Sequence, residues 1–219
     1  MSSYQEVINE AKSEYMKALL EKITDLLLVN GIESMKMPMI AKSVDIGVAT
    51  LYRYFHTKKN LVIACAINVW KRINLLFAGI FESEIYQNKT GYEQIKQLLK
   101  IEIVMYQGHA DYLKFIAEFD TYVIHENISS VELAEYEANI LNVSEKIELA
   151  YQKGLKDHSI TYQGDFAVFY QTCSHALNAL SLKLVNQGFI IESDSLVSGE
   201  KQLELLIDIM LKYLREEKI

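Results

Sequence analysis

The sequence predicts an all-helical protein. Its 219 residues include one proline and nine glycines, so few positions interrupt a helix. Apolar residues recur every three or four positions over long stretches, and no long run alternates apolar and polar residues as a half-buried strand would. Half of the residues are hydrophobic, which is enough for one small domain and one of ordinary size. We expect about nine helices from this periodicity.

The first predicted helix covers residues 5–30. From Met16 to Leu27 its apolar residues follow helical spacing, and charged residues occupy the other side. Gly31 is expected to end the helix in a left-handed conformation, with Ile32 making the accompanying apolar contact. This helix would be the scaffold on which two shorter helices pack.

Residues 35–61 have the pattern of two short helices joined by a tight turn. The first of them has one apolar face, formed by Ile40, Ala41 and Val44. Pro38 suits its first turn. The tripeptide at 45–47 interrupts the pattern, and we expect Gly47 to supply backbone angles that other residues resist.

The second short helix would present two different faces. Leu51 and Phe55, four residues apart, point inward. The outward face is uncharged except for one arginine, and it comprises Val48, Ala49, Tyr52 and Arg53, flanked by Thr50 and Tyr54. Such a face suits reading base edges in the major groove of DNA. Lys58 and Lys59 follow where a phosphate backbone would pass.

The pair Ile40-Ala41, the run IGVATLYRYF at 46–55 and the run TKKNL at 57–61 together resemble the helix-turn-helix signature of the tetracycline-repressor-like (TetR) family. The resemblance extends back to Leu19 and covers roughly a quarter of the chain. Asp45 stands where the family usually has Gly, and Gly47 replaces a capping Ser. Lys36 replaces a Thr at the start of the first short helix, where it can substitute a charge.

The resemblance implies a DNA-binding domain over residues 1–58 and a helical ligand-binding and dimerisation body over residues 59–219. The implied function is a sequence-specific transcriptional regulator, a repressor that a small apolar or aromatic ligand releases from its double-stranded operator. Arg53 is the candidate for reading guanine. The predicted DNA-binding residues are Lys36, Gly47, Val48, Ala49, Thr50, Tyr52, Arg53, Tyr54 and Lys58, of which Thr50, Tyr54 and Lys58 carry over the family's phosphate contacts.

Charge is distributed as this function requires. Residues 1–60 hold eight basic and seven acidic residues, a net +1, whereas residues 61–219 hold 14 and 22, a net −8. Between Ser34 and Asn60 there are five basic residues and one acidic residue. The positive field is therefore local to the proposed DNA-binding module, and the acidic remainder favours one docking orientation.

The body is predicted to begin with a long helix over residues 59–83 that is apolar nearly all round and links it to the DNA-binding module. Residues 88–91 form the first clear break, and Glu132 fits a capping arrangement with the serines before it. Further helices are expected at 92–107, 111–125, 130–156, 164–187 and 199–217.

Aromatic residues gathered in the body have two interpretations. One is ordinary core packing. The resemblance implies the other, an apolar ligand cavity with a few convergent polar groups. The candidate ligand-binding residues are Glu102, Tyr106, His109, Phe115, Phe119, Tyr122, Tyr170, His175 and Asn178, with Glu118 as a further polar candidate.

The last two helices also have two interpretations. Their apolar stripes either cover the body or form a four-helix interface with a second copy, and we favour the homodimer, through residues 165–187 and 200–217. The expected contacts are Ala176, Leu177, Leu180, Leu184, Leu203, Leu206, Met210 and Leu214. A dimer of this kind reads two half-sites about one helical turn (~34 Å) apart.

Several function classes are not expected. The five histidines and two cysteines show no metal-ligand or nucleophile spacing, so we predict no enzyme, no metal and no cofactor. The lone cysteines and the polar amino terminus indicate a cytoplasmic protein. The most apolar run, Leu61 to Trp70, is shorter than the ~18–20 residues of a membrane span. The rival hypothesis is an architectural DNA-associated protein of the same fold that recruits a protein partner and senses no small molecule.

Overall fold

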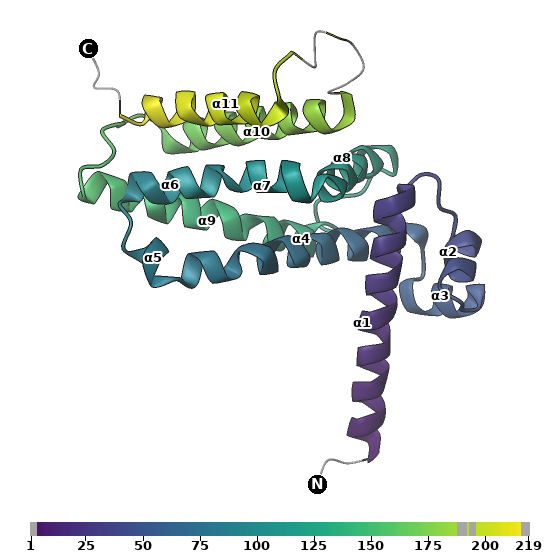
Figure 1. Cartoon of the computed structure of the whole chain (residues 1–219). Helices are drawn as coiled ribbons and strands as arrows, with labels where there is room; N and C mark the ends of the chain where they lie inside the picture. The colour runs from purple at the N-terminus through teal and green to yellow at the C-terminus, as the bar shows by residue number, and fades with distance from the viewer. Residues whose placement is uncertain (1–3, 188–191, 193–195, 216–219) are drawn as a thin grey trace. The chain divides into compact units, whose positions relative to one another are not determined.

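The structure is a computed structural model that describes residues 4–187, 192 and 196–215 (Figure 1). Over these residues the chain forms eleven helices and no strand, which confirms the all-helical prediction. Two differences account for the larger number of helices. A short helix follows Ser83, and the predicted helix at 92–107 is two helices that meet at Lys100.

Two compact units make up the chain. The first contains residues 1–74 and 115–139, and the second contains residues 75–114 and 140–219. Three helices contribute residues to both units: α4 (Lys58–Glu82), α8 (Ala110–His125) and α9 (Ala134–Lys156). The division of the chain into a DNA-binding domain and a body at residue 58 stays a prediction.

The first unit begins with α1 (Tyr4–Asn30), α2 (Met37–Ser43) and α3 (Val48–Phe55), followed by the first part of α4. The end of α1 is as predicted, because Gly31 has a φ of 79° and donates its N–H to the carbonyl oxygen of Leu27 at 2.8 Å. Apolar side chains that are fully buried close this module: Ile23, Leu27, Ile32, Ile40 and Leu51.

The parts of α8 and α9 in the first unit are joined by a capped turn. Ser129 and Glu132 bond each other reciprocally, with the Ser129 N–H donating to the Glu132 carboxylate at 3.0 Å. The predicted capping arrangement is therefore confirmed. The helix nevertheless begins at Ala134 and not at Ser130, because the capped residues form a separate turn before it.

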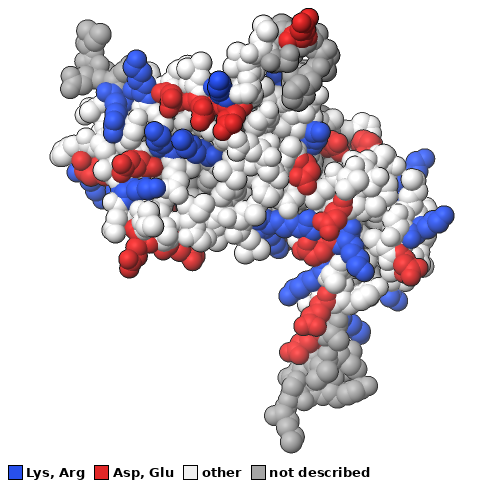
Figure 2. Space-filling view, in the orientation of Figure 1, with Lys and Arg blue, Asp and Glu red and all other residues white. Residues whose placement is uncertain are grey.

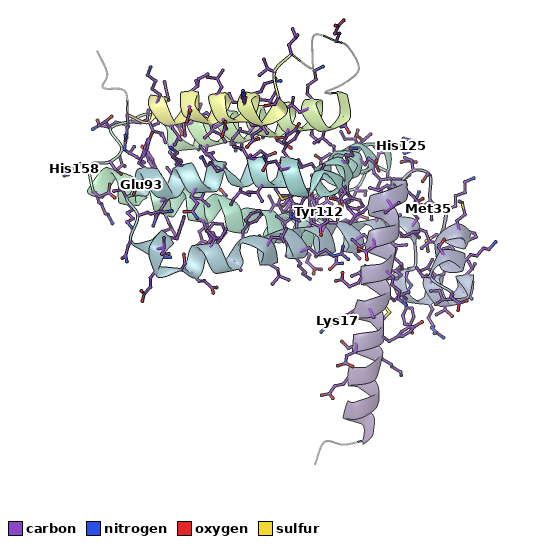
Figure 3. The ribbon with its side chains drawn as sticks, viewed as in Figure 1. Lys17, Met35, Glu93, Tyr112, His125 and His158 are labelled. Atoms are coloured by element: carbon purple, nitrogen blue, oxygen red, sulfur yellow. The ribbon has the colours of Figure 1, made fainter. Side chains whose placement is uncertain are left out.

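The second unit contains α5 (Glu84–Gln87), α6 (Gly91–Leu99), α7 (Ile101–Gly108), α10 (Phe166–Gln187) and α11 (Gly199–Tyr213), with parts of α4, α8 and α9. A capping box of Thr90 and Glu93 starts α6 (Figure 3 labels Glu93). Helices α7, α10 and α11 contact one another and form much of the core. Buried side chains on them include Ile103, Leu177, Leu184, Leu203, Ile207 and Leu211.

The inward faces of α10 and α11 differ from the sequence-based expectation. Five residues assigned to the dimer interface are buried within one chain: Leu177, Leu184, Leu203, Met210 and Leu214. Each is at most 6 % exposed, so these five residues are not available to a partner and their assignment is wrong, whereas Ala176, Leu180 and Leu206 are half-buried. The outward apolar residues on these helices are instead Val168, Leu205, Ile209 and Tyr213, which we call the outer stripe.

Helix α4 has nearly the predicted bounds, but its apolar character extends beyond the run from Leu61 to Trp70. Among the described residues it is the one helix that meets the length and composition of a membrane span, with a mean hydropathy of 1.5 over its most apolar 18 residues. Half of that window is buried inside the fold. Core helices have the same composition, and the burial of Leu61, Val62, Cys65 and Val69 places α4 in this class.

Candidate nucleic-acid interface

In the turn between α2 and α3, Asp45 is the residue with a left-handed backbone conformation. The φ of Asp45 is 57°, whereas Gly47 is extended, with φ −68° and ψ 142°, and acts as the N-cap of α3. The expectation that Gly47 supplies the left-handed angles is therefore wrong. Asp is one of the few residues that tolerate this region, because its short side chain can bond locally.

The two faces of α3 are arranged as predicted. Leu51 and Phe55 are buried, while Val48 and Tyr52 are 37 % and 45 % exposed. Ala49 and Arg53 are also exposed, and Thr50 and Tyr54 on the flanks are half-buried. An eight-residue helix thus presents two apolar or aromatic side chains and one guanidinium to solvent, an arrangement that fits a major groove.

Arg53 is supported by aromatic rings. Its guanidinium carbon lies 5.2 Å from the centre of the Tyr54 ring, within the range of a cation–π contact. The Tyr54 ring contacts Tyr15 of α1, with 6.4 Å between ring centres. Sequence analysis missed Tyr15. Its only signal is a half-exposed tyrosine on a helix whose other outward residues are mostly charged.

Basic side chains surround α3, but they are not equally free. Lys36 and Lys42 are exposed (Figure 2 shows basic side chains over this module). Lys58 is half-buried with its ammonium 5.7 Å from the Tyr122 ring centre. Lys59 is ion-paired with Glu132 at 2.5 Å, and this contact, with bonds from Ser129, lowers the pKa of Glu132 to about 2.

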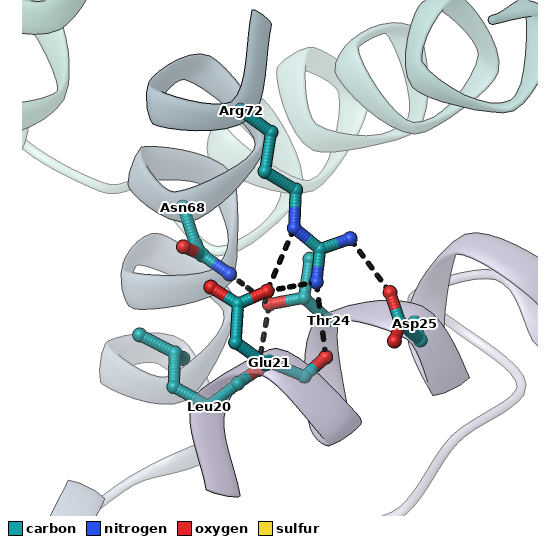
Figure 4. Close-up of polar contacts among 6 residues, drawn as sticks. All are labelled: Leu20, Glu21, Thr24, Asp25, Asn68 and Arg72. Atoms are coloured by element: carbon teal, nitrogen blue, oxygen red, sulfur yellow. Dashed lines mark hydrogen bonds and ion pairs between the residues drawn. The ribbon is translucent and has the colours of Figure 1, made fainter. Parts of the chain in front are cut away.

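A polar cluster joins α4 to α1 (Figure 4). The Arg72 guanidinium donates to the carboxylates of Glu21 and Asp25, the latter at 2.6 Å, and these partners raise its pKa against the opposing effect of burial. One turn earlier, the Asn68 amide donates to the hydroxyl of Thr24 at 3.1 Å, with both residues buried. Helix α1 and the first part of α4 are thus fastened by polar bonds as well as by apolar contacts.

Glu118 of α8 has a structural role in the first unit. Its carboxylate accepts the N–H of Ile32 at 2.9 Å and lies against Gly31, directly after α1. This bond satisfies a backbone donor at the corner that leads into α2. Glu118 is therefore a support of the helix-turn-helix module, whereas the sequence suggested a polar group of a ligand site.

The predicted ligand-binding residues are divided between the two units. Phe115, Phe119 and Tyr122 are buried in the first unit, where Phe119 packs against Tyr136 with ring centres 4.6 Å apart. The others belong to the second unit: Glu102, Tyr106, His109, Tyr170, His175 and Asn178. Of these, His175 and Asn178 are exposed on the outward side of α10, so they do not line an interior cavity of a single chain.

A three-helix module with a tight turn, a buried inner face and a mixed outward face on α3 defines a helix-turn-helix protein. Residues 19–65 match the family model described as "Bacterial regulatory proteins, tetR family". The match covers α2, α3 and the adjoining parts of α1 and α4, so the amino-terminal module is similar to the DNA-binding domain of this family.

Relatives of known function match part of the chain. The chain is 32 % identical over 72 residues to the transcriptional repressor KstR of Mycolicibacterium smegmatis, a match that covers 33 % of this chain and 35 % of that protein. A KstR of Rhodococcus jostii is 32 % identical over 66 residues, covering 30 % of this chain and 31 % of the relative. The matched stretch spans about a third of the length of these relatives.

Solved structures match the fold over most of the chain. A transcriptional regulator of Saccharomonospora viridis, solved in complex with choline, has a TM-score of 0.72 at 16 % identity, covering 94 % of this chain and 100 % of that one. FadR of Bacillus subtilis, solved with stearoyl-CoA, has a TM-score of 0.60 at 14 % identity, covering 92 % and 100 %. At these identities the likeness concerns the fold alone.

Proposed function

We propose that this protein is a dimeric repressor that binds a double-stranded operator through α3. The observation that carries the proposal is the outward face of α3, where Arg53 stands beside Val48 and Ala49 in the spacing of a recognition helix. Lys36, Thr50, Tyr54 and Lys58 surround it as phosphate contacts, which fix the position of the module without specifying sequence. A cytoplasmic location accords with this function and stays a prediction.

The protein would have two forms, one that binds DNA and one that does not. A small molecule would release the operator if its affinity for the second form exceeded its affinity for the first. Fold neighbours solved with choline and with stearoyl-CoA support a role for the helical body in holding such molecules. Helices α4, α8 and α9 contribute to both units, and α4 is the one that follows α3 in the chain, so α4 is the element through which binding in the second unit would reach α3. Of the predicted ligand contacts, Glu102, Tyr106, His109 and Tyr170 remain candidates within the second unit.

The proposal is tested by selecting duplex fragments with the purified protein and measuring Kd for the selected duplex and for a scrambled one. Arg53→Ala is expected to weaken binding to the selected duplex by about 1–3 kcal/mol, because a contact to a base is lost. Affinity for the scrambled duplex should be nearly unchanged. Lys36→Ala is the matched control for a phosphate contact. This substitution should weaken binding to both duplexes equally. It should also reduce the slope of log affinity against log salt concentration by about 1. Absence of any DNA binding at low ionic strength would contradict the proposal.

A further inference from the structure

Two unpartnered polar atoms lie together in the second unit. Oε1 of Glu102, on α7, and Oγ of Ser181, on α10, are both buried and have no hydrogen-bond partner. Ser181 is 0 % exposed, and its hydroxyl lies near enough to the Glu102 carboxyl to lower the pKa of that group by a hydrogen-bonding contact, although the two atoms do not meet the distance and angle of an ordinary hydrogen bond. Three such side-chain atoms occur in the described chain, and two of them are in this pair.

The neighbours of Ser181 along its own helix are apolar. On α10, Leu177 and Leu184 share the buried side of Ser181 by helical spacing, and both are less than 9 % exposed. No ion pair to Glu102 occurs among the described residues. Burial raises the pKa of Glu102, and the neighbouring Ser181 hydroxyl opposes this rise. A carboxylate in such a place leaves at least one acceptor oxygen without a donor.

Tyr106 extends the polar side of α7. It lies four residues after Glu102, so the two side chains are on the same face of the helix. Its hydroxyl stands where a side chain added at Gly199, the first residue of α11, would lie. Helix α7 contacts both α10 and α11. The pair therefore lies where these three helices of the second unit pack together.

Buried polar atoms without partners are rare, and each costs roughly 1–3 kcal/mol of stability. A protein that keeps two of them side by side has acceptors available for a group that brings donors and positive charge. An ammonium group supplies up to three N–H donors and neutralises the carboxylate, whereas a hydroxyl supplies one donor and no charge. A carboxylate or phosphate would add repulsion to the same oxygen.

We propose that Glu102 and Ser181 form the polar end of a binding site for a small organic cation, a primary ammonium with an apolar tail. The ammonium donates to Oε1 of Glu102 and to Oγ of Ser181, and the tail lies along the apolar side chains of α7 and α10. This inference rests on the proposed function, because it names the chemical class of the molecule that the body would sense.

The test uses three probes with the same tail: n-octylamine, n-octanol and n-octanoate. Calorimetry on the full-length protein at neutral pH should give octylammonium a Kd about ten to a hundred times lower than that of octanol, with octanoate weakest, since a charged hydrogen bond is the difference. Glu102→Gln should reduce the preference for the amine over the alcohol at least tenfold. Ser181→Ala should reduce it by a smaller factor.

Glu148→Gln is the matched control, because Glu148 is an exposed carboxylate on α9, and it should leave all three affinities unchanged. Circular dichroism without probe establishes whether each variant is folded. If Glu102→Gln does not fold, the comparison of probes is made with Ser181→Ala alone. Equal affinity for amine and alcohol, no binding of octylamine at millimolar concentration, or a preference that survives in both variants would overturn the inference. Binding of the selected duplex, measured on the same samples, reports separately on the proposed function.

Discussion

Gly91 and Gly154 allow two backbones of the second unit to approach closely. A Cβ atom added to Gly91 would lie 2.0 Å from the backbone nitrogen of Gly154 and 2.3 Å from the carbonyl oxygen of Ala150. The same corner is fixed by polar bonds, because the N–H of Gly91 donates to the Asp157 carboxylate at 2.8 Å. His158, which has a φ of 58°, follows in the turn after α9 (labelled in Figure 3). The absence of a side chain at Gly91 is thus a packing requirement.

Gly91→Ala is expected to lower the free energy of unfolding by roughly 1–3 kcal/mol, because α6 must move away from α9 to make room. The matched control is Gly79→Ala in α4, where an added Cβ meets no atom within 4 Å. That change should be neutral or should stabilise the protein by roughly 0.5–1 kcal/mol, the usual gain from replacing glycine in a helix. Thermal unfolding followed by circular dichroism measures both. Equal destabilisation by the two substitutions would contradict the packing argument.

Residue-level chemistry also separates what the sequence could predict from what it could not. The inward positions of Leu51 and Phe55 follow from local spacing, and the structure agrees. Glycine is the commonest residue in the left-handed conformation, so the sequence favours Gly47 for that conformation in the turn. In the structure Asp45 adopts it. Contacts made over long sequence separation, such as Tyr15 with Tyr54 and Glu118 with Ile32, leave no periodic signal in the chain.

At the scale of elements, helix α4 is fastened to α1 by the polar cluster around Arg72. The Arg72 side chain is 19 % exposed, while those of Glu21 and Asp25 are 50 % and 64 % exposed. These carboxylates can recover water if the arginine is removed, so the loss should be moderate. The bonds of Asn68 and Thr24 beneath them are buried and add directional contacts between the same two helices.

Arg72→Met is expected to lower the free energy of unfolding by roughly 1–2 kcal/mol, because two charge-assisted contacts disappear while the apolar stem is kept. Lys71→Met is the matched control. Its ion pair with Glu135 is 3.9 Å long and its side chain is 56 % exposed, so the change should be within about 0.5 kcal/mol of zero. Urea unfolding followed by the fluorescence of Trp70, the single tryptophan, reports on the same unit. A loss for Lys71→Met as large as for Arg72→Met would contradict this assignment.

The helices of the body show why periodicity alone was insufficient. Apolar spacing predicts that α4, α8, α10 and α11 exist, and it predicts their approximate bounds. The predicted and observed ends of these helices differ by a few residues. The orientation of α10 and α11 does not follow, because each carries apolar residues on two sides. The apolar spacing predicts the stripe through Leu177 and Leu203 as an interface, whereas these residues fill the chain's own core. The choice between two apolar stripes depends on neighbours distant in sequence.

At the scale of the whole molecule, DNA recognition by one helix-turn-helix module is limited, and in the proposed dimer a second copy would supply the second half-site. We propose the outer stripe as the surface for this pairing. Leu205, Ile209 and Tyr213 follow one another at four-residue intervals along α11 and are 62 %, 57 % and 49 % exposed. Val168 of α10, 62 % exposed, adds to it. Apolar residues repeated on one helix face in this way are typical of a helix-to-helix interface.

The double substitution L205E/I209E should convert the protein from a dimer to a single chain of 25.2 kDa, measured by light scattering after size-exclusion chromatography, because it places buried like charges across a symmetric interface. Leu149→Glu is the matched control, since Leu149 is 64 % exposed on α9 away from the outer stripe, and it should remain dimeric. The single chains should lose affinity for the selected two-half-site duplex while keeping their affinity for scrambled DNA. An unaltered protein that already elutes as one chain, or an L205E/I209E variant that stays dimeric, would place the partner's contact elsewhere on the chain.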